Sequence, residues 1–297
     1  MPLVILLLLS YPTGVRADPL QAFNTRDISV FHDRSLEGPA REIAGIYPSV
    51  RDELETTLGL RADFRPAVML LSDRAAFEQA TGSRLIVAYA VPSETLMVID
   101  YPRASEDPFS TRAILKHELC HLVLHRHIPS IPRWLDEGIC QWASDGLAEL
   151  LSERRRPSLP WIGMSGALFP LRSLDLHFPQ DERGLAQAYD QSRSVIDYVV
   201  SRYGPNSIPN LLFSLQKGLS LEDAFRACLG TSLSRLEEDW RDSIGTWPAL
   251  LAFIMTNIYT VIFFLAALST VAGYVRYRIR KRRLREEEEE ELIPGNP

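Results

Sequence analysis

Histidine and glutamate side chains are concentrated between Lys116 and His127, in the sequence KHELCHLVLHRH. Within this stretch His117, Glu118 and His121 form the pattern H-E-x-x-H. Residues four apart on a helix lie on one face, so both imidazoles can reach the same metal ion. Glu118 stands beside them, where its carboxylate can accept a proton from a water molecule that the ion activates. The pattern therefore predicts a zinc centre of the hydrolytic kind.

Two residues compete for the place of a third metal ligand, which catalytic zinc sites usually have besides an open position for water. His127 follows His121 by six residues, the offset of the metzincin motif H-E-x-x-H-x-x-G-x-x-H. That motif needs a glycine where this chain has Leu124, a strong helix former. Glu137 lies in the segment PRWLDEG, on a second predicted helix that a short proline-containing loop folds back against the first. Glu137 is the stronger candidate and His127 the alternative.

The two motifs together, H-E-x-x-H followed by W-L-x-E-G, resemble those of the gluzincin peptidases. The likeness is to the peptidase MA-like proteins, which share the catalytic fold of thermolysin and aminopeptidase N. Matched residue by residue, the resemblance implies that His117, His121 and Glu137 hold zinc and that Glu118 is the general base. It also implies a peptide or protein substrate.

A later segment extends the resemblance. Tyr189 and Ser192, followed by Val195, are similar to the family's Y-x-x-G/S-x-x-V helix, which implies that the Tyr189 hydroxyl stabilises an oxyanion. The family's aminopeptidases carry G-x-M-x-N on a substrate-side strand, and the strand-like runs LIVAYA and TLMVID contain nothing similar. We therefore expect an endopeptidase. Gln141 stands where relatives often carry an acidic residue, which predicts a weaker supporting contact to the metal ligands.

The periodicity and capping residues predict an α+β fold, with a mixed sheet first and helices afterwards. Strand-like runs occupy 27–31, 66–71, 85–90 and 95–100. Helices are expected at 36–58, 73–80, 110–127, 132–144, 185–202, 208–215, 221–228 and 234–244, with an irregular connection over 152–184. The resemblance covers about residues 25–245 and implies a thermolysin-like zincin catalytic domain over that range.

The C-terminal region predicts one transmembrane helix. Residues 247–275 are dominated by apolar side chains, and a helix needs about 20 such residues to cross a bilayer. Seven basic residues follow within 276–285, and cationic side chains beside a span stay on the cytoplasmic side. Six glutamates, 286–291, come next. We expect a cytoplasmic tail over 276–297 and a catalytic domain outside the cytoplasm.

The N-terminal region predicts a signal peptide over residues 1–17, with the apolar run LVILLLL and a small residue, Ala17, before the cleavage point. A buried N-terminal strand is the alternative. The net charge is −6, and the segment 276–291, with seven basic and six acidic residues, contributes +1 of it, so the rest of the chain carries about −7 and has no basic surface suited to nucleic acid. Cys120, Cys140 and Cys228 match no cysteine-based zinc site, and we expect buried thiols, with a Cys120–Cys140 disulfide as the alternative.

These observations favour a membrane-anchored, extracytoplasmic zinc peptidase. The principal alternative is an anchored binding protein that retains the fold without activity. A histidine-rich core helix that binds no metal is a third possibility, but it leaves the W-L-x-E-G match unexplained.

Overall fold

The structure is a computed structural model that describes residues 20–82, 84–106, 109–144, 168–244, 254–255 and 257–291. The chain divides into two compact units, Met1–Ser243 and Ile244–Pro297, which are described separately. The predicted signal peptide, residues 152–167 of the predicted connection, the first residues of the predicted span and the end of the tail lie outside the described residues.

A five-stranded mixed sheet forms the first part of unit Met1–Ser243, with strand order β1-β2-β3-β5-β4. The strands are β1 (Gln21–Asn24), β2 (Ser29–His32), β3 (Ala67–Leu71), β4 (Ala88–Val91) and β5 (Leu96–Asp100). Strands β2, β3 and β5 run parallel, whereas β1 and β4 pair antiparallel at the two edges. All of β5 is buried, as expected for an inner strand covered on both faces. The predicted sheet is confirmed; β1 is an addition that its short, exposed sequence did not indicate.

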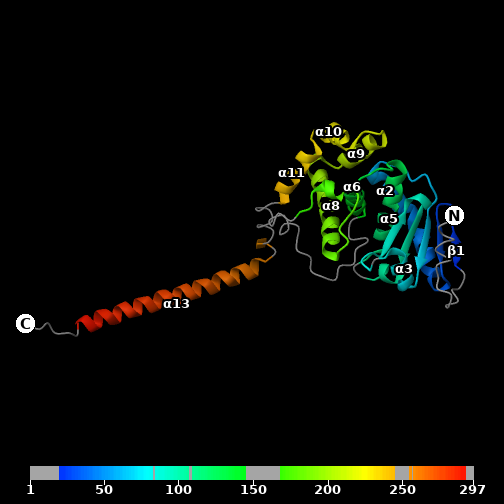
Figure 1. The fold of residues 1–297 in the computed structure, drawn as a ribbon. Helices are drawn as coiled ribbons and strands as arrows, with labels where there is room; N and C mark the ends of the chain where they lie inside the picture. Colours follow the sequence, from blue (N-terminus) through cyan, green and yellow to red (C-terminus); the bar gives the residue numbers. More distant parts are fainter. Residues whose placement is uncertain are drawn as a thin grey trace, which may run out of the picture. The chain divides into compact units, whose positions relative to one another are not determined.

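Helices α2 (Glu37–Leu58), α3 (Arg74–Thr81) and α4 (Tyr101–Ala104) belong to this sheet-containing half (Figure 1). Asp73 caps α3, and Gly59 and Gly82 end α2 and α3 in the left-handed conformation that glycine adopts without strain. Two 3-10 turns, Arg34–Leu36 and Pro92–Glu94, complete this half, and the second joins β4 to β5.

Helix α5 (Thr111–His127) contains the H-E-x-x-H motif. Its residues from Ile114 to Leu124 are all buried, because α2, α6, β4 and β5 pack around it. Ser110 caps its start, and the chain leaves the helix at Ile128, before a proline. Helix α6 (Arg133–Ala143) begins directly after Pro132 and packs against α5. The two motifs are therefore brought together by a short turn between two buried helices.

The second half is helical, as predicted (Figure 1). After the 3-10 turn Leu171–Leu174 it consists of α8 (Glu182–Tyr203), α9 (Ser207–Gln216), α10 (Leu221–Leu229) and α11 (Leu233–Ile244). Helix α8 begins three residues earlier than expected because Asp181 caps it through Gly184 N–H. Its buried face packs on α6, so the motif helices are enclosed between the sheet and α8.

Unit Ile244–Pro297 contains helix α13 (Ile258–Glu291). Among the described residues it is the one helix long and apolar enough to cross a membrane, over Ile258–Arg283, with a mean hydropathy of 1.9. At 1.5 Å per residue the uncharged part, 258–275, spans roughly 27 Å, close to the thickness of a hydrocarbon core. The helix continues through the basic residues and the glutamates.

Candidate active site

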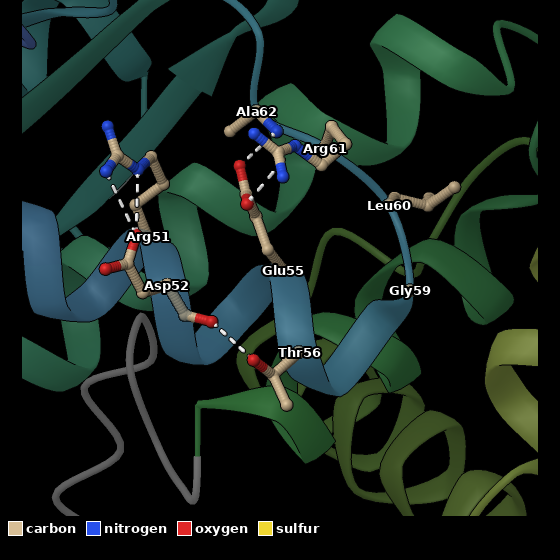
Figure 2. Close-up of a pocket in the computed structure, with 8 residues that line it drawn as sticks. All are labelled: Arg51, Asp52, Glu55, Thr56, Gly59, Leu60, Arg61 and Ala62. Atoms are coloured by element: carbon tan, nitrogen blue, oxygen red, sulfur yellow. Dashed lines mark hydrogen bonds and ion pairs between the residues drawn. The ribbon is translucent and has the colours of Figure 1, made fainter.

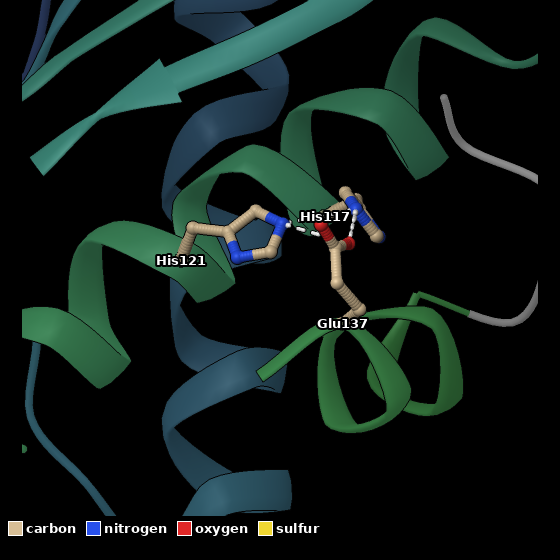
Figure 3. Close-up of side chains that lie close together, drawn as sticks. All are labelled: His117, His121 and Glu137. Atoms are coloured by element: carbon tan, nitrogen blue, oxygen red, sulfur yellow. Dashed lines mark hydrogen bonds and ion pairs between the residues drawn. The ribbon is translucent and has the colours of Figure 1, made fainter. Parts of the chain in front are cut away.

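Three side chains from α5 and α6 converge on one point (Figure 3). The Nε2 atoms of His117 and His121 are 3.1 Å apart. Glu137 Oε2 lies 3.8 Å from His117 Nε2 and 3.6 Å from His121 Nε2. All three residues are buried, and together they could hold a metal ion. We refer to these three candidate ligands as the ligand group.

The donor set and its spacing fit zinc. Nitrogen and oxygen ligands bind zinc at about 2.0–2.2 Å, which places neighbouring ligands of a tetrahedron about 3.3 Å apart. The observed separations of 3.1 to 3.8 Å bracket that value. Two imidazoles and one carboxylate are also the set of a catalytic rather than a structural zinc site.

His121 is oriented by Asp136, the residue before Glu137. Asp136 Oδ1 lies 3.0 Å from His121 Nδ1, and Asp136 Oδ2 lies 3.0 Å from His125 Nε2. Burial alone would raise the pKa of Asp136, but the charges and hydrogen bonds of His121 and His125 hold it well below its usual value. An ionised carboxylate only accepts, so His121 Nδ1 carries the proton and Nε2 is left to bind metal.

Cys140 lies against the same imidazole, with Sγ 3.5 Å from His121 Nδ1. Asp136, His121 and Cys140 form a second group of possible metal ligands. Because His121 Nδ1 donates to Asp136, we interpret Asp136 and Cys140 as residues that position the His121 ring and not as a second metal site. Cys120 and Cys140 are both buried free thiols, and burial raises the pKa of the Cys140 thiol.

The two oxygens of Glu137 face different neighbours. Oε2 points to the histidines, whereas Oε1 accepts a 3.2 Å hydrogen bond from the Tyr189 hydroxyl and lies 3.7 Å from Arg133 Nε. Gln141 of α6 joins α8 at this point, because its Nε2 donates to the backbone carbonyl of Tyr189 at 3.2 Å. Gln141 thus fixes the tyrosine helix, a role that its position in the motif did not indicate.

The surroundings of Gly138 explain why the motif W-L-x-E-G ends in glycine. A Cβ added there would collide with the Ser192 carbonyl oxygen and lie 2.8 Å from Ile196 Cγ1 on α8. Only a residue without a side chain lets α6 and α8 approach this closely. That approach brings Tyr189 to Glu137, a separation of 52 positions in sequence.

Glu118 follows His117 directly on α5, and its side chain is fully buried. A carboxylate that is removed from bulk water and adjacent to a metal position suits proton transfer at that position.

His127, the alternative third ligand, lies elsewhere. Its Nε2 donates to the Arg61 carbonyl at 2.8 Å, and its Nδ1 accepts from Gln216 Nε2 at 3.0 Å. Arg61 belongs to the segment after α2 that Figure 2 shows beside a cavity of about 590 Å³. The structure therefore ties His127 to the segment after α2 and to α9, and does not place it with His117 and His121.

A cavity of about 790 Å³ opens onto the ligand group. It is lined by the edge strand β4, by His121, His125, Arg133 and Glu137 of the motif helices, by Leu176, and by Leu185 and Tyr189 of α8. Access to the metal position thus passes along a strand edge, where backbone groups are available to an extended chain.

The comparisons with known proteins agree with this geometry. A family model, the Peptidase MA superfamily, matches residues 78–246. This match includes both motifs and more than half of the chain. The chain therefore belongs to the Peptidase MA superfamily, and the prediction of this family is confirmed. The comparison with curated proteins gave no match.

The solved structures with partial similarity to this chain include two peptidases. The M1 zinc metallopeptidase from Deinococcus radiodurans has 14% sequence identity and a TM-score of 0.46, over 76% of this chain and 52% of that one. Aminopeptidase A from Legionella pneumophila, in complex with aspartic acid, has 13% identity and a TM-score of 0.42, over 75% of this chain and 27% of that one. The chain therefore spans about half the length of the Deinococcus enzyme and about a quarter of the length of the Legionella enzyme. The predicted α+β class is confirmed by the mixed sheet and the helices of the structure itself.

The sequence reasoning missed three residues of the site: Arg133, Asp136 and Cys140. Asp136 and Cys140 flank Glu137 within one helical turn, so their spacing on the predicted helix offered a signal. Arg133 offered none, because its neighbour Phe178 belongs to the connection that the sequence left irregular.

Proposed function

We propose that the protein is a membrane-anchored, zinc-dependent endopeptidase with its catalytic unit outside the cytoplasm. The observation that carries the proposal is the convergence of His117 Nε2, His121 Nε2 and Glu137 Oε2 at zinc-ligand spacing. Glu118 lies beside them on α5, and a peptide-sized cavity leads to the group.

In this proposal His117, His121 and Glu137 hold the ion. Bound zinc supplies activation of water and polarisation of the scissile carbonyl. Glu118 takes a proton from the attacking water and passes it to the leaving amine. Its burial keeps that proton from exchanging freely with solvent.

Tyr189 is proposed to stabilise the oxyanion of the tetrahedral intermediate. Its hydroxyl now donates to Glu137 Oε1, and its ring packs edge-on against Phe178 at 5.3 Å between centroids. The phenol therefore lies at the ligand group, and a small rotation of the side chain redirects its hydrogen bond to substrate.

Strand β4 supports the choice of an endopeptidase. It is an edge strand that lines the cavity, so an extended peptide can pair with it by backbone hydrogen bonds. The runs LIVAYA and TLMVID, which include most of β4 and all of β5, contain no G-x-M-x-N motif to hold a free N-terminus. A peptide bound in this way can extend past the metal on both sides.

Helix α13 supports the membrane anchor. Its apolar part has the length of a single span, and the basic residues that follow favour a cytoplasmic C-terminus. A signal peptide over residues 1–17 would agree with that orientation.

The test is a cleavage assay on full-length protein in detergent, with and without a zinc chelator, against N-terminally blocked and unblocked peptides. Chelator-sensitive cleavage of both kinds is expected. Zinc-loaded protein that cleaves neither kind would favour the alternative, an anchored binding protein with a zincin fold.

A further inference from the structure

Arg133 has a distinctive place in the active-site cavity. It begins α6, one helical turn before Glu137, and it is the one lysine or arginine among the described residues that line the cavity. Its side chain is 41% exposed, and its Nε lies 3.7 Å from Glu137 Oε1. A permanent positive charge therefore borders both the substrate space and the metal position.

Phe178 fixes the orientation of this charge. The Arg133 guanidinium lies over the Phe178 ring, with Cζ 4.7 Å from the ring centroid. The Arg133 backbone is also held, because its N–H donates to the Asp175 carbonyl at 2.8 Å. Stacking uses the flat face of a guanidinium, whereas its N–H donors lie along the edge and match a carboxylate in geometry. The arrangement is that of a preorganised anion site.

Three acidic residues line the cavity in the part of the chain that the structure describes: Asp136, Glu137 and Asp175. Asp136 is engaged by His121 and His125, as described above. Asp175 Oδ1 accepts a 3.1 Å hydrogen bond from Trp134 Nε1, and burial raises the pKa of Asp175. The charge of Glu137 would be shared with zinc once the ion is bound, which weakens its attraction for Arg133. Metal binding thus makes this end of the cavity more favourable to an anion.

We propose that Arg133 binds a carboxylate of the substrate, so that the enzyme prefers peptides with an acidic group next to the scissile bond. This proposal rests on the proposed peptidase function and adds a substrate class to it. Because Arg133 borders Glu137, a carboxylate on Arg133 belongs to a residue that flanks the cleaved bond. Leu176, 78% exposed on the same cavity, offers an apolar surface that such a peptide would cover. In an endopeptidase this carboxylate is an acidic side chain; a C-terminal carboxylate in its place would mean that residues are removed from the end of a peptide.

The test measures peptide binding rather than turnover, in zinc-loaded full-length protein that carries Glu118→Gln. Fluorescent peptides with amidated C-termini are compared in pairs that differ by Glu or Gln at one scanned position. A third peptide has Gln throughout and a free C-terminal carboxylate. We expect one acidic peptide to bind roughly 10-fold or more tightly than its neutral partner, as for a charge-assisted hydrogen bond. The peptide that gains affinity identifies the source of the carboxylate.

Adding Arg133→Gln should remove this preference while the affinity for neutral peptides changes less than about threefold. Arg172→Gln is the matched control, since Arg172 is an exposed arginine close to Asp175 that does not line the cavity. Arg133→Lys keeps the charge but loses the planar fork, and it should retain part of the preference. It also serves as the test variant if Arg133→Gln fails to fold.

Three results would overturn the proposal: no acidic preference before Arg133 is changed, a preference that survives Arg133→Gln, or an equal loss of zinc and of all peptides in that variant. The last result would show that Arg133 acts only through Glu137. Since no turnover is measured, an Arg133-dependent preference in a protein that never cleaves peptides would uphold the carboxylate site and reject the peptidase.

Discussion

The Tyr189 hydroxyl donates a 3.2 Å hydrogen bond to Glu137 Oε1, and it joins helix α8 to the carboxylate that completes the ligand group on α6. Two roles are therefore combined in one phenol, because the same hydroxyl is proposed to stabilise the oxyanion. We predict that Tyr189→Phe lowers kcat by roughly 10²- to 10³-fold, as for other oxyanion donors, with little change in KM. Steady-state kinetics at saturating zinc provide the measurement. A variant with normal kcat but weakened zinc binding would show that Tyr189 only positions Glu137.

The identity of the third ligand predicts a specific pattern of metal loss. His121→Ala and Glu137→Ala should each reduce zinc from about one ion per chain to a small fraction, because each removes a donor atom from the group. His127→Ala should keep the metal, since His127 is bonded to Arg61 and Gln216. Metal analysis of dialysed full-length protein measures this. Zinc lost from the His127 variant and kept by the Glu137 variant would contradict the assignment.

Asp136 should affect metal affinity without touching the ion. Asp136→Ala removes the acceptor that fixes the His121 tautomer, so zinc affinity should fall by roughly 10- to 100-fold. Asp136→Asn retains an acceptor for His121 Nδ1–H and should lose less. Competition with a chromogenic chelator reports the affinities. Asp175→Asn is the control, because Asp175 lines the same cavity but bonds Trp134. Equal affinities in the Asp136→Ala variant and the wild type would reject the supporting role.

Much of this site follows from local sequence signals. Helices α5 and α6 were predicted nearly to the residue, because Ser110 and two prolines mark their ends and their apolar residues recur with helical spacing. The ligand group was predictable for the same reason, since helix geometry alone places His117 and His121 together.

Other features depend on tertiary packing. Contacts of Glu137 with Tyr189 and of Arg133 with Phe178 join segments that are 52 and 45 residues apart, and no local pattern reports them. Strand β1 was missed because its residues are largely exposed and it is stabilised by pairing with β2. The role of Asp136 depends on the angle between two helices, which sequence spacing does not determine.

The membrane topology can be tested with reporter fusions. A reporter joined after residue 297 should be cytoplasmic, because the basic residues after the apolar part of α13 resist export. A reporter that replaces the chain after Gly245 should be exported if residues 1–17 direct secretion. An exported C-terminal reporter would contradict the predicted orientation. A cytoplasmic reporter after Gly245 would contradict the predicted signal peptide.

The most direct test of a zinc peptidase is the Glu118→Gln variant. Glu118 is proposed to move protons without holding the metal, and glutamine has nearly the same size but cannot accept the proton. Zinc content and peptide hydrolysis are measured on the same preparations of full-length wild type and variant. We predict unchanged zinc, about one ion per chain, and a loss of hydrolysis of at least about 10²- to 10⁴-fold, the usual contribution of a general acid–base group. Hydrolysis that persists in the zinc-loaded Glu118→Gln variant would contradict the proposed mechanism.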